Sequence, residues 1–212
     1  MARRAARGSQ LRSTLTMEAD WDALIGPDEP AIVAPWEGFA DLRLHPEAAH
    51  TLPETAAWPE LAEALLTLHA PASPVFTSKC DLWPLASEDI DPYEFDATPD
   101  HAAYGIAAYI DIVPAHAAVH TSFPATEQLV RALVEDLRRQ TLAHPGRVDC
   151  VLRPADIDNG PGFAFTLYTA ACGATESSAR AHWKAVLHAA VLATIRAAIA
   201  AVNNRDAANA GA

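Results

Sequence analysis

The chain lacks the short sequence patterns that mark the common catalytic folds. It contains no Gly-x-x-x-x-Gly-Lys, Gly-x-Gly-x-x-Gly, Cys-x-x-Cys, His-Glu-x-x-His or Gly-x-Ser-x-Gly motif. Such motifs bind nucleotide phosphates, hold zinc or present a serine nucleophile, so P-loop ATPases, dinucleotide enzymes, zinc ribbons and serine hydrolases lose support. An enzyme that assembles its site from residues scattered along the chain stays open as an alternative.

Cysteine is scarce, with three residues in the chain of 212. Cys80, Cys150 and Cys172 cannot all pair within one chain, and each lies in or beside a predicted strand, where a thiol behaves as a small apolar group. The arginine-rich N-terminus is followed by no apolar stretch of signal-peptide length. We therefore expect a cytoplasmic protein with a disordered basic tail at residues 1–16, although Met17 could be the true start.

Basic residues are also few, with 15 Lys and Arg against 27 Asp and Glu and a formal net charge of −12. An acidic surface repels phosphate groups, so we expect neither nucleic acid nor an anionic membrane as a partner. A basic protein partner suits this charge, and no motif implies a cofactor. The most apolar window, residues 185–202, carries His188 and Arg196 and is mostly alanine, which is typical of a packed helix rather than a membrane span.

The order strand, strand, helix is predicted twice in the last two-thirds of the chain. At a fixed offset, the segment Gly105–Ile110 overlays Gly162–Leu167, with a glycine first and large apolar side chains recurring. The pattern predicts an α+β fold, with an antiparallel sheet of four to five strands from a ββα-ββα duplication and the two long helices on one face. The expected elements are strands at 75–83 and 104–113 with a helix at 124–140, then strands at 147–153 and 162–171 with a helix at 178–202.

One domain is expected from residue 17 to 203, followed by a disordered tail at 204–212. Leucines at helical spacing after Pro59 predict a further helix at 59–69 near one edge of the sheet. Residues 39–44 could add an edge strand. The apolar stripe on the last helix is wide enough to form a homodimer interface as well as a contact with the sheet.

Alternation in the strand at 75–83 predicts which side chains share a face of the sheet. In this interpretation Phe76, Ser78, Cys80 and Leu82 lie on one side, and Thr77, Lys79 and Asp81 lie on the other. Similarly, Phe163 and Phe165 share a face, whereas Tyr168 lies on the opposite one and could line a pocket.

The connection at 84–103 is long and acidic. Long connections without an element of their own are often functional, so we interpret it as a solvated loop that can act as a partner-binding lid. Its spacing does not fit a calcium loop, because an EF-hand would need a glycine where Glu94 stands. The partner-binding candidates are Glu88, Asp89, Asp91, Tyr93, Glu94, Phe95 and Asp96.

Two weak chemical candidates lie elsewhere in the sequence. His116 and His120 are four residues apart, which can place two imidazoles on one helical face, but two ligands do not complete a zinc site. Cys172 lies where a strand passes into a helix, whose N-terminus can stabilise a thiolate. His182 and Tyr168 are its possible catalytic partners, although a buried structural thiol explains the same position.

The preferred interpretation is therefore a non-catalytic binding module, such as an adaptor, a chaperone or an immunity-like protein. It would capture a basic protein through the 84–103 connection and the exposed face of the sheet. The alternative is an enzyme or small-molecule binder whose pocket lies between the sheet and the helices.

Overall fold

A computed structural model, which describes residues 17–141, 144 and 146–210, shows an α+β fold. The six strands form one mixed sheet of order β1-β5-β6-β4-β3, with β2 also paired to β5. The expected tail at 1–16 lies outside the described residues. The elements are β1 (Glu18–Ala23), β2 (Ile32–Ala34), α1 (Pro59–Leu68), β3 (Val75–Leu85), β4 (Tyr104–Pro114), α2 (Ala117–His120), α3 (Phe123–Arg138), β5 (Gly146–Ile157), β6 (Gly160–Gly173) and α4 (Glu176–Ala210).

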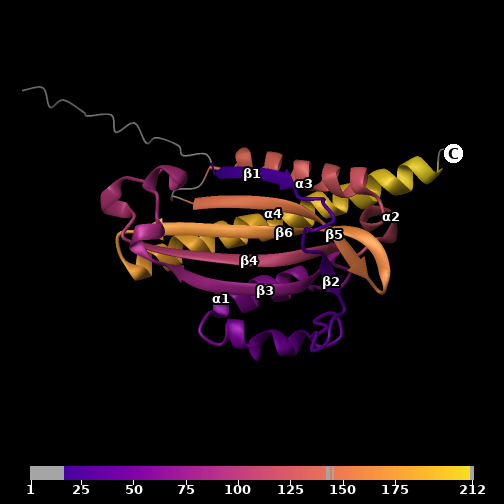
Figure 1. Cartoon of the computed structure of the whole chain (residues 1–212), viewed down its shortest axis with the longest axis horizontal. Helices are drawn as coiled ribbons and strands as arrows, with labels where there is room; N and C mark the ends of the chain where they lie inside the picture. The colour runs from indigo at the N-terminus through magenta and orange to yellow at the C-terminus, as the bar shows by residue number, and fades with distance from the viewer. Residues whose placement is uncertain (1–16, 142–143, 145, 211–212) are drawn as a thin grey trace, which may run out of the picture.

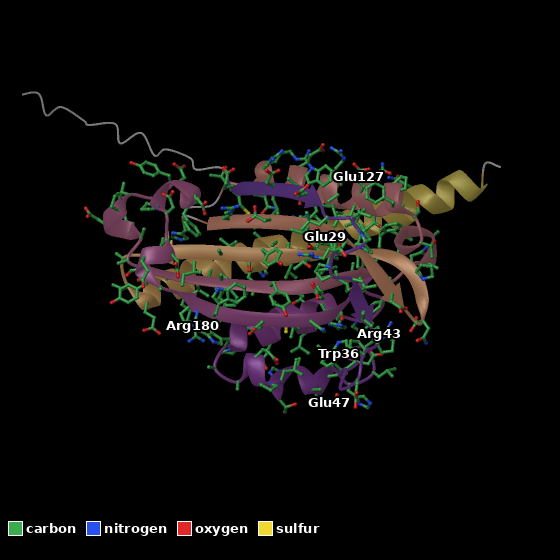
Figure 2. All side chains as sticks on the ribbon, viewed as in Figure 1. Glu29, Trp36, Arg43, Glu47, Glu127 and Arg180 are labelled. Atoms are coloured by element: carbon green, nitrogen blue, oxygen red, sulfur yellow. The ribbon has the colours of Figure 1, made fainter. Side chains whose placement is uncertain are left out.

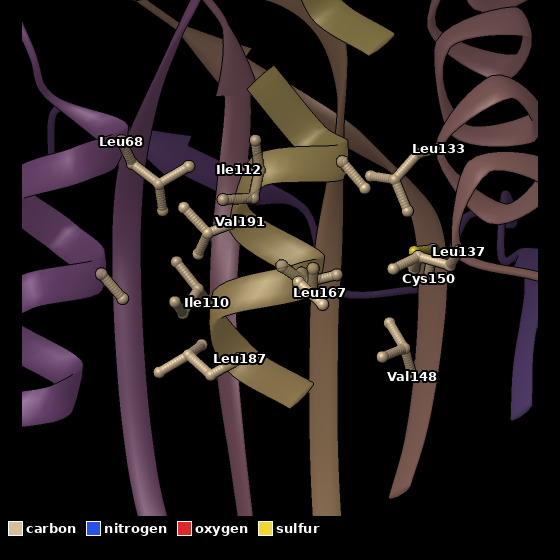
Figure 3. Close-up of a cluster of buried hydrophobic side chains, with 14 of the residues drawn as sticks. Leu68, Ile110, Ile112, Leu133, Leu137, Val148, Cys150, Leu167, Leu187 and Val191 are labelled. Atoms are coloured by element: carbon tan, nitrogen blue, oxygen red, sulfur yellow. The ribbon is translucent and has the colours of Figure 1, made fainter. Parts of the chain in front are cut away.

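Three helices cover one face of the sheet, which we call the helix face. Figure 1 shows α1, α3 and α4 behind the strands, and contacts join α4 to β6 and β4, α3 to β1 and β5, and α1 to β3. The two long helices α3 and α4 thus lie on the same face, as predicted, and α1 joins them as a third. Between the layers lies the main core, whose centre is drawn in Figure 3 and includes Ile110, Leu137, Cys150, Leu167 and Val191.

Alternation of side chains explains how the central strands build this core. In β4 the residues Ile106, Ala108, Ile110 and Ile112 are all buried against the helices. Successive side chains of a strand point to opposite faces, so the residues between them lie on the other face, which we call the open face. Burying large aliphatic groups on one face of each strand fixes the register, because a slip by one residue would expose them.

The expectation of an antiparallel sheet is correct for four strands and wrong for two. Neighbours in β5, β6, β4 and β3 are antiparallel, but β1 and β2 both run parallel to β5, along its first and second halves. Two short extended pieces of the proline-rich N-terminal region thus use the outer edge of β5.

The predicted edge strand at 39–44 is absent from the described structure. Its residues instead form turns in which the Asp41 carboxylate accepts bonds from the backbone N–H and the guanidinium of Arg43. Leu44 is 72 % exposed there. An aspartate that accepts bonds from nearby donors competes with the hydrogen bonds between strands. This segment therefore forms turns instead of a strand.

A β-bulge in β3 changes which of its side chains share a face, so the predicted faces are partly wrong. The register to β4 shifts between Thr77 and Cys80, so two residues, Ser78 and Lys79, oppose the single residue Asp111 and β3 carries one extra residue. Alternation restarts after the bulge. Thr77 therefore shares the helix face with Cys80, whereas Phe76 lies on the open face with Asp81, contrary to the simple alternation.

The turn between β5 and β6 and the start of α4 follow the sequence signals. Asp158 and Asn159 both adopt positive φ, the geometry of a two-residue hairpin turn that their side chains tolerate. Thr175 and Ser178 bond each other's backbone N–H through their hydroxyls, which caps the first turn of α4.

The long helix α4 meets the length and composition of a membrane span over Glu176–Asn204, and half of its apolar window is buried within the protein. That burial is against the sheet, α3 and α1. The apolar stripe is thus used within the chain. The helix continues to Ala210, past the limit of 203 expected for the folded domain.

In the sheet, the unit of β3, β4 and α3 lies beside the unit of β5, β6 and α4, with β4 paired to β6. Ile110 of β4 lies directly opposite Leu167 of β6, which is the residue that it overlays in the sequence pattern. On either side, Cys80 pairs with Ile110 and Cys150 pairs with Leu167. Equivalent positions of the two units therefore carry cysteines.

Candidate functional site

The open face of the sheet is covered at its two ends and exposed in the middle. At one end a small apolar cluster forms around Ile32, Phe76 and Val113, and at the other a second cluster forms around Phe95 and Cys172. Figure 1 shows the sheet from this side, with the β3–β4 connection at one end and β2 at the other. We call the exposed middle the trough.

The end of the trough near β2 is held by the bulge of β3. The Ser78 hydroxyl donates to the Val33 carbonyl at 2.5 Å, and the Trp36 indole N–H donates to the Ser78 carbonyl at 3.3 Å. Lys79 lies with its Nζ 5.2 Å from the centre of the Trp36 ring. Figure 2 shows Trp36 beside β3. The bulge thus ties the N-terminal segment to the sheet edge.

The acidic connection closes the other end. Its Phe95 is 4 % exposed and packs with Ile90, Ala102 and Cys172, so it anchors the connection to the sheet. Glu94 accepts a 2.7 Å bond from Arg147 of β5, which also donates to Asp149. Of the predicted partner-binding residues, Phe95 therefore serves burial and Glu94 an ion pair.

The remaining residues predicted for partner binding are near or on the surface of the connection. Tyr93 is 88 % exposed. Asp91 caps a short 3-10 turn by accepting a bond from the backbone of Tyr93, and Asp96 adopts positive φ at the end of that turn. Glu88 and Asp89 are exposed in another such turn. The segment is thus structured by short turns rather than by a longer element.

The trough carries an excess of negative charge. Side chains directly opposite one another across paired strands share a face, so the register identifies the open-face residues. Arg147 is already paired, and no ion pair within the described residues involves Glu18, Asp22 or Asp81. The charged residues of the trough are Glu18, Asp20, Asp22, Asp81, Asp111 and Asp149, against Lys79, Arg147 and Arg153.

A single row of polar and aromatic side chains crosses the trough. Asp149 of β5 lies opposite Tyr168 of β6, which lies opposite Tyr109 of β4, which lies opposite Asp81 of β3. The tyrosine rings are 6.1 Å apart between centroids. We call these four residues the central row. Asp20 of β1 continues it beyond Asp149.

Asp111 is the buried carboxyl group of the trough, with 8 % exposure. Burial raises the pKa of Asp111, and the bond from Thr166 together with the charges of Arg153 and Lys79 only partly offsets this. Oδ1 accepts the Thr166 hydroxyl at 2.7 Å, and no bond to Oδ2 exists among the described residues. Since no fully buried side-chain oxygen there lacks a partner, Oδ2 must reach the trough surface.

Two hollows flank the tyrosine pair. One, of about 380 Å³, spans the β3 edge of the sheet and is lined by Tyr109, Asp81, Trp36 and Glu54 together with Leu65 and Cys80 of the helix face. The other, of about 470 Å³, is lined by Tyr168 and Asp149 together with carboxylates of β1 and the acidic connection. Volumes of this size accommodate side chains or small ligands. Each hollow thus combines a tyrosine face with carboxylate oxygens.

The outer edge of β1 is closed to a further strand. Leu24 N–H bonds to β5, so the N–H groups of Trp21 and Ala23 point away from it, and each is bonded by the preceding aspartate carboxylate. On the same edge the Ala19 carbonyl accepts from the Arg138 guanidinium. Blocked edge groups disfavour pairing with a partner strand.

Cys172 lies beneath the acidic connection and is fully buried. Burial raises the pKa of its thiol to about 11. His182 contacts the Cys172 carbonyl oxygen through Nδ1 at 2.7 Å, and its ring stacks on His144. The imidazole therefore bonds the backbone of Cys172, and the thiol stays protonated at neutral pH.

His116 and His120 lie on the short helix α2, beyond the far end of β4. His116 Nδ1 accepts a bond from the Ala118 backbone, and His120 Nδ1 lies 2.8 Å from the Pro114 carbonyl. Within the part of the chain that the structure describes, no three His, Cys, Asp or Glu side chains are grouped to hold a metal. Cys172 pairs near the start of β4, so about 30 Å of strand separates it from these histidines.

Sequence reasoning identified Tyr168 but not the other members of the central row. Asp111 is the single charged residue of β4, and Asp149 lies between Val148 and Cys150 in β5, which are signals that were available. Their convergence with Tyr109 depends on strand register, which the chain order alone does not give.

No family model, no curated protein and no solved structure matches this chain. The functional argument therefore rests on the geometry of the trough.

Proposed function

We propose that this protein is a non-catalytic binding module that takes a basic segment of a protein partner in the trough. The observation that carries the proposal is the unbalanced charge of the trough, together with two tyrosine-lined hollows. The acidic connection would contribute Asp89, Asp91 and the exposed Tyr93 at one end. We further propose that the module works in the cytoplasm, where its three thiols stay reduced.

Charge complementarity supports a cationic ligand. Carboxylates that form no ion pair, such as Asp22 and Asp81, are stabilised by an incoming ammonium or guanidinium group, and a concave surface with low-dielectric walls strengthens that attraction. The buried Asp111 adds to this argument, since a destabilising buried carboxylate is often retained for a binding role.

The closed outer edge of β1 disfavours docking of a partner strand at that edge of the sheet. A partner that added a strand there would have to displace the bonds to Trp21, Ala23 and Ala19. The trough needs no such rearrangement. We therefore propose that side chains of the partner, rather than its backbone, make the main contacts.

The test is the binding of a labelled oligo-arginine peptide, measured by fluorescence anisotropy over a range of salt concentrations. Affinity should fall as salt rises. The double variant Asp81→Asn/Asp149→Asn should weaken binding by about tenfold, from the loss of two charge contacts.

The matched control is Glu63→Gln/Glu135→Gln, which removes two exposed carboxylates from the helices α1 and α3. It removes the same number of negative charges as the trough variant but leaves the trough intact. Equal losses in the two double variants, or no binding by the unmodified protein, would remove the proposed function.

The finer view of the fold, that the two ββα units arose by duplication, is also a proposal. Its support is the pairing of Ile110 with Leu167 at the centre of the sheet and the cysteines of β3 and β5 that pair with these two residues. Separate superposition of the two units, matched at these residues, would test it.

A further inference from the structure

The central row joins two carboxylates and two tyrosines in one line across four strands. Asp81 and Tyr109 form its one half, and Tyr168 and Asp149 form the other. Each half borders its own hollow. We propose that each half is a socket for an arginine side chain, so that the trough recognises two arginines of one extended segment. This inference rests on the proposed function and makes it specific.

The molecule already uses the same combination of groups for its own arginines. In each case the guanidinium bonds a carboxylate while it lies 4.0 to 4.6 Å from the centre of an aromatic ring. The three examples are Arg43 with Asp41 and Phe76, Arg131 with Glu127 and Trp21, and Arg180 with Glu60 and Trp58.

The Asp81–Tyr109 half provides the carboxylate and the ring without an arginine. In the other half, Asp149 already accepts a bond from Arg147 through Oδ2 and keeps Oδ1 for an incoming group. Among the described residues, no Lys or Arg stacks on Tyr109 or Tyr168, and Asp81 forms no ion pair. Burial, followed by the charges of nearby carboxylates, raises the pKa of Tyr109, so its ring is a neutral phenol at physiological pH. A guanidinium can stack on such a ring while it pairs with the adjacent carboxylate.

Arginine fits these sockets better than lysine. The guanidinium is planar and weakly hydrated, so it can face a ring and donate in its own plane to a carboxylate. The lysine ammonium is a compact and strongly hydrated charge with no plane to stack. Both residues satisfy the charge of the trough, but arginine alone uses both parts of a socket.

The distance between the sockets sets the spacing of the two arginines. Asp81 and Asp149 are three strand steps apart, which is about 14 Å at the usual separation of strands. An extended chain covers that distance in about four residues, and residues two or four apart point to the same side. The segment should therefore carry arginines at positions i and i+4, with position i+2 above the tyrosine pair.

The experiment compares short labelled peptides of serine and threonine by fluorescence anisotropy. One carries two arginines four positions apart, one carries them adjacent, and one carries lysines four apart. We expect the first to bind about tenfold more tightly than the second, because adjacent side chains cannot fill both sockets. The lysine peptide should bind several-fold less tightly than the first, at about the strength of charge alone.

Two variants separate stacking from charge. Tyr109→Leu/Tyr168→Leu should remove the preference for arginine over lysine, whereas Tyr109→Phe/Tyr168→Phe should keep it, because phenylalanine retains the ring. The conservative pair also reports on folding. Binding that ignores spacing and residue type, with oligo-arginine still bound, would overturn this inference alone. Failure of oligo-arginine to bind at all would overturn the proposed function as well.

Discussion

The two faces of the sheet differ in composition and in role. On the helix face, Ile110, Leu167 and their neighbours are buried, and the strands β4, β5 and β6 contribute large aliphatic groups. On the open face, the same strands present carboxylates, tyrosines and small residues between two covered ends. The comparison shows that one face supplies stability and that the other keeps polar groups that stability does not require.

The largest expected difference between the two faces is the loss of folding stability when a tryptophan is removed. Trp183 of α4 is fully buried, contacts Trp58 and donates to Thr169, whereas Trp83 is 37 % exposed on the open face. Trp183→Ala should cost about 3 to 5 kcal/mol through cavity formation. Trp83→Ala should cost clearly less, because 37 % of Trp83 is already exposed and its removal leaves no enclosed cavity. Urea unfolding of both variants checks this, and equal costs would contradict the division of roles.

A buried histidine makes the helix side sensitive to acid. His69 is 9 % exposed, lies near the Leu65 carbonyl through Nδ1 and accepts the Thr77 N–H through Nε2, which links α1 to β3. Burial lowers its pKa, so the unfolded chain binds a proton more readily and stability falls as pH drops below about 6.5.

The loss should level off at lower pH, once the folded-state imidazole is protonated as well. His69→Gln does not titrate and should flatten this part of the curve in thermal unfolding at several pH values. An unchanged slope would show that His69 is not the group responsible.

The buried group of the open face should behave in the opposite way. The pKa of Asp111 is raised, so its contribution to stability is present at low pH and lost as pH rises through the folded-state pKa. Asp111→Asn keeps an acceptor for Thr166 and removes a buried charge, so it should stabilise the protein by about 1 kcal/mol at neutral pH.

The same variant should weaken binding of oligo-arginine, because it removes a negative charge from the trough. Chemical unfolding and anisotropy measured on one preparation test both effects. A destabilised variant that binds normally would make Asp111 a structural residue instead.

The reactivity of the cysteine thiols should differ least between the two faces, because burial affects the thiols of both. Burial raises the pKa of Cys80 to about 12 and that of Cys172 to about 11, and it also raises the pKa of Cys150. A thiol-reactivity titration of the native protein near neutral pH should find all three at least about tenfold slower than in denaturant. A single fast thiol at Cys172 would revive a catalytic cysteine.

Elements that rest on local pattern could be predicted from the sequence. The helix at 59–69 and the long helices follow from apolar spacing, and the turn at Asp158 and Asn159 follows from residues that tolerate positive φ. What failed depended on tertiary contacts. The parallel pairing of β1 and β2 needs the free edge of β5, and the bulge at Ser78 needs the bonds to Val33 and Trp36.

The candidate site was predictable only in outline. Net charge predicted a basic partner, and the length of the connection at 84–103 marked one end of the trough. The burial of Phe95 was not predicted, because an aromatic residue in an acidic loop gives no local sign of its anchor. The central row was missed since Asp81, Tyr109 and Asp149 come from three strands that are distant in sequence.

Chemical-shift mapping of the labelled protein with the peptide that carries arginines four positions apart tests the central claim most directly. The account predicts that the largest shifts fall on the open-face residues Asp81, Tyr109, Asp149 and Tyr168, with small shifts across α1, α3 and α4. Shifts concentrated on the helices, or scattered evenly over acidic residues of both faces, would contradict it.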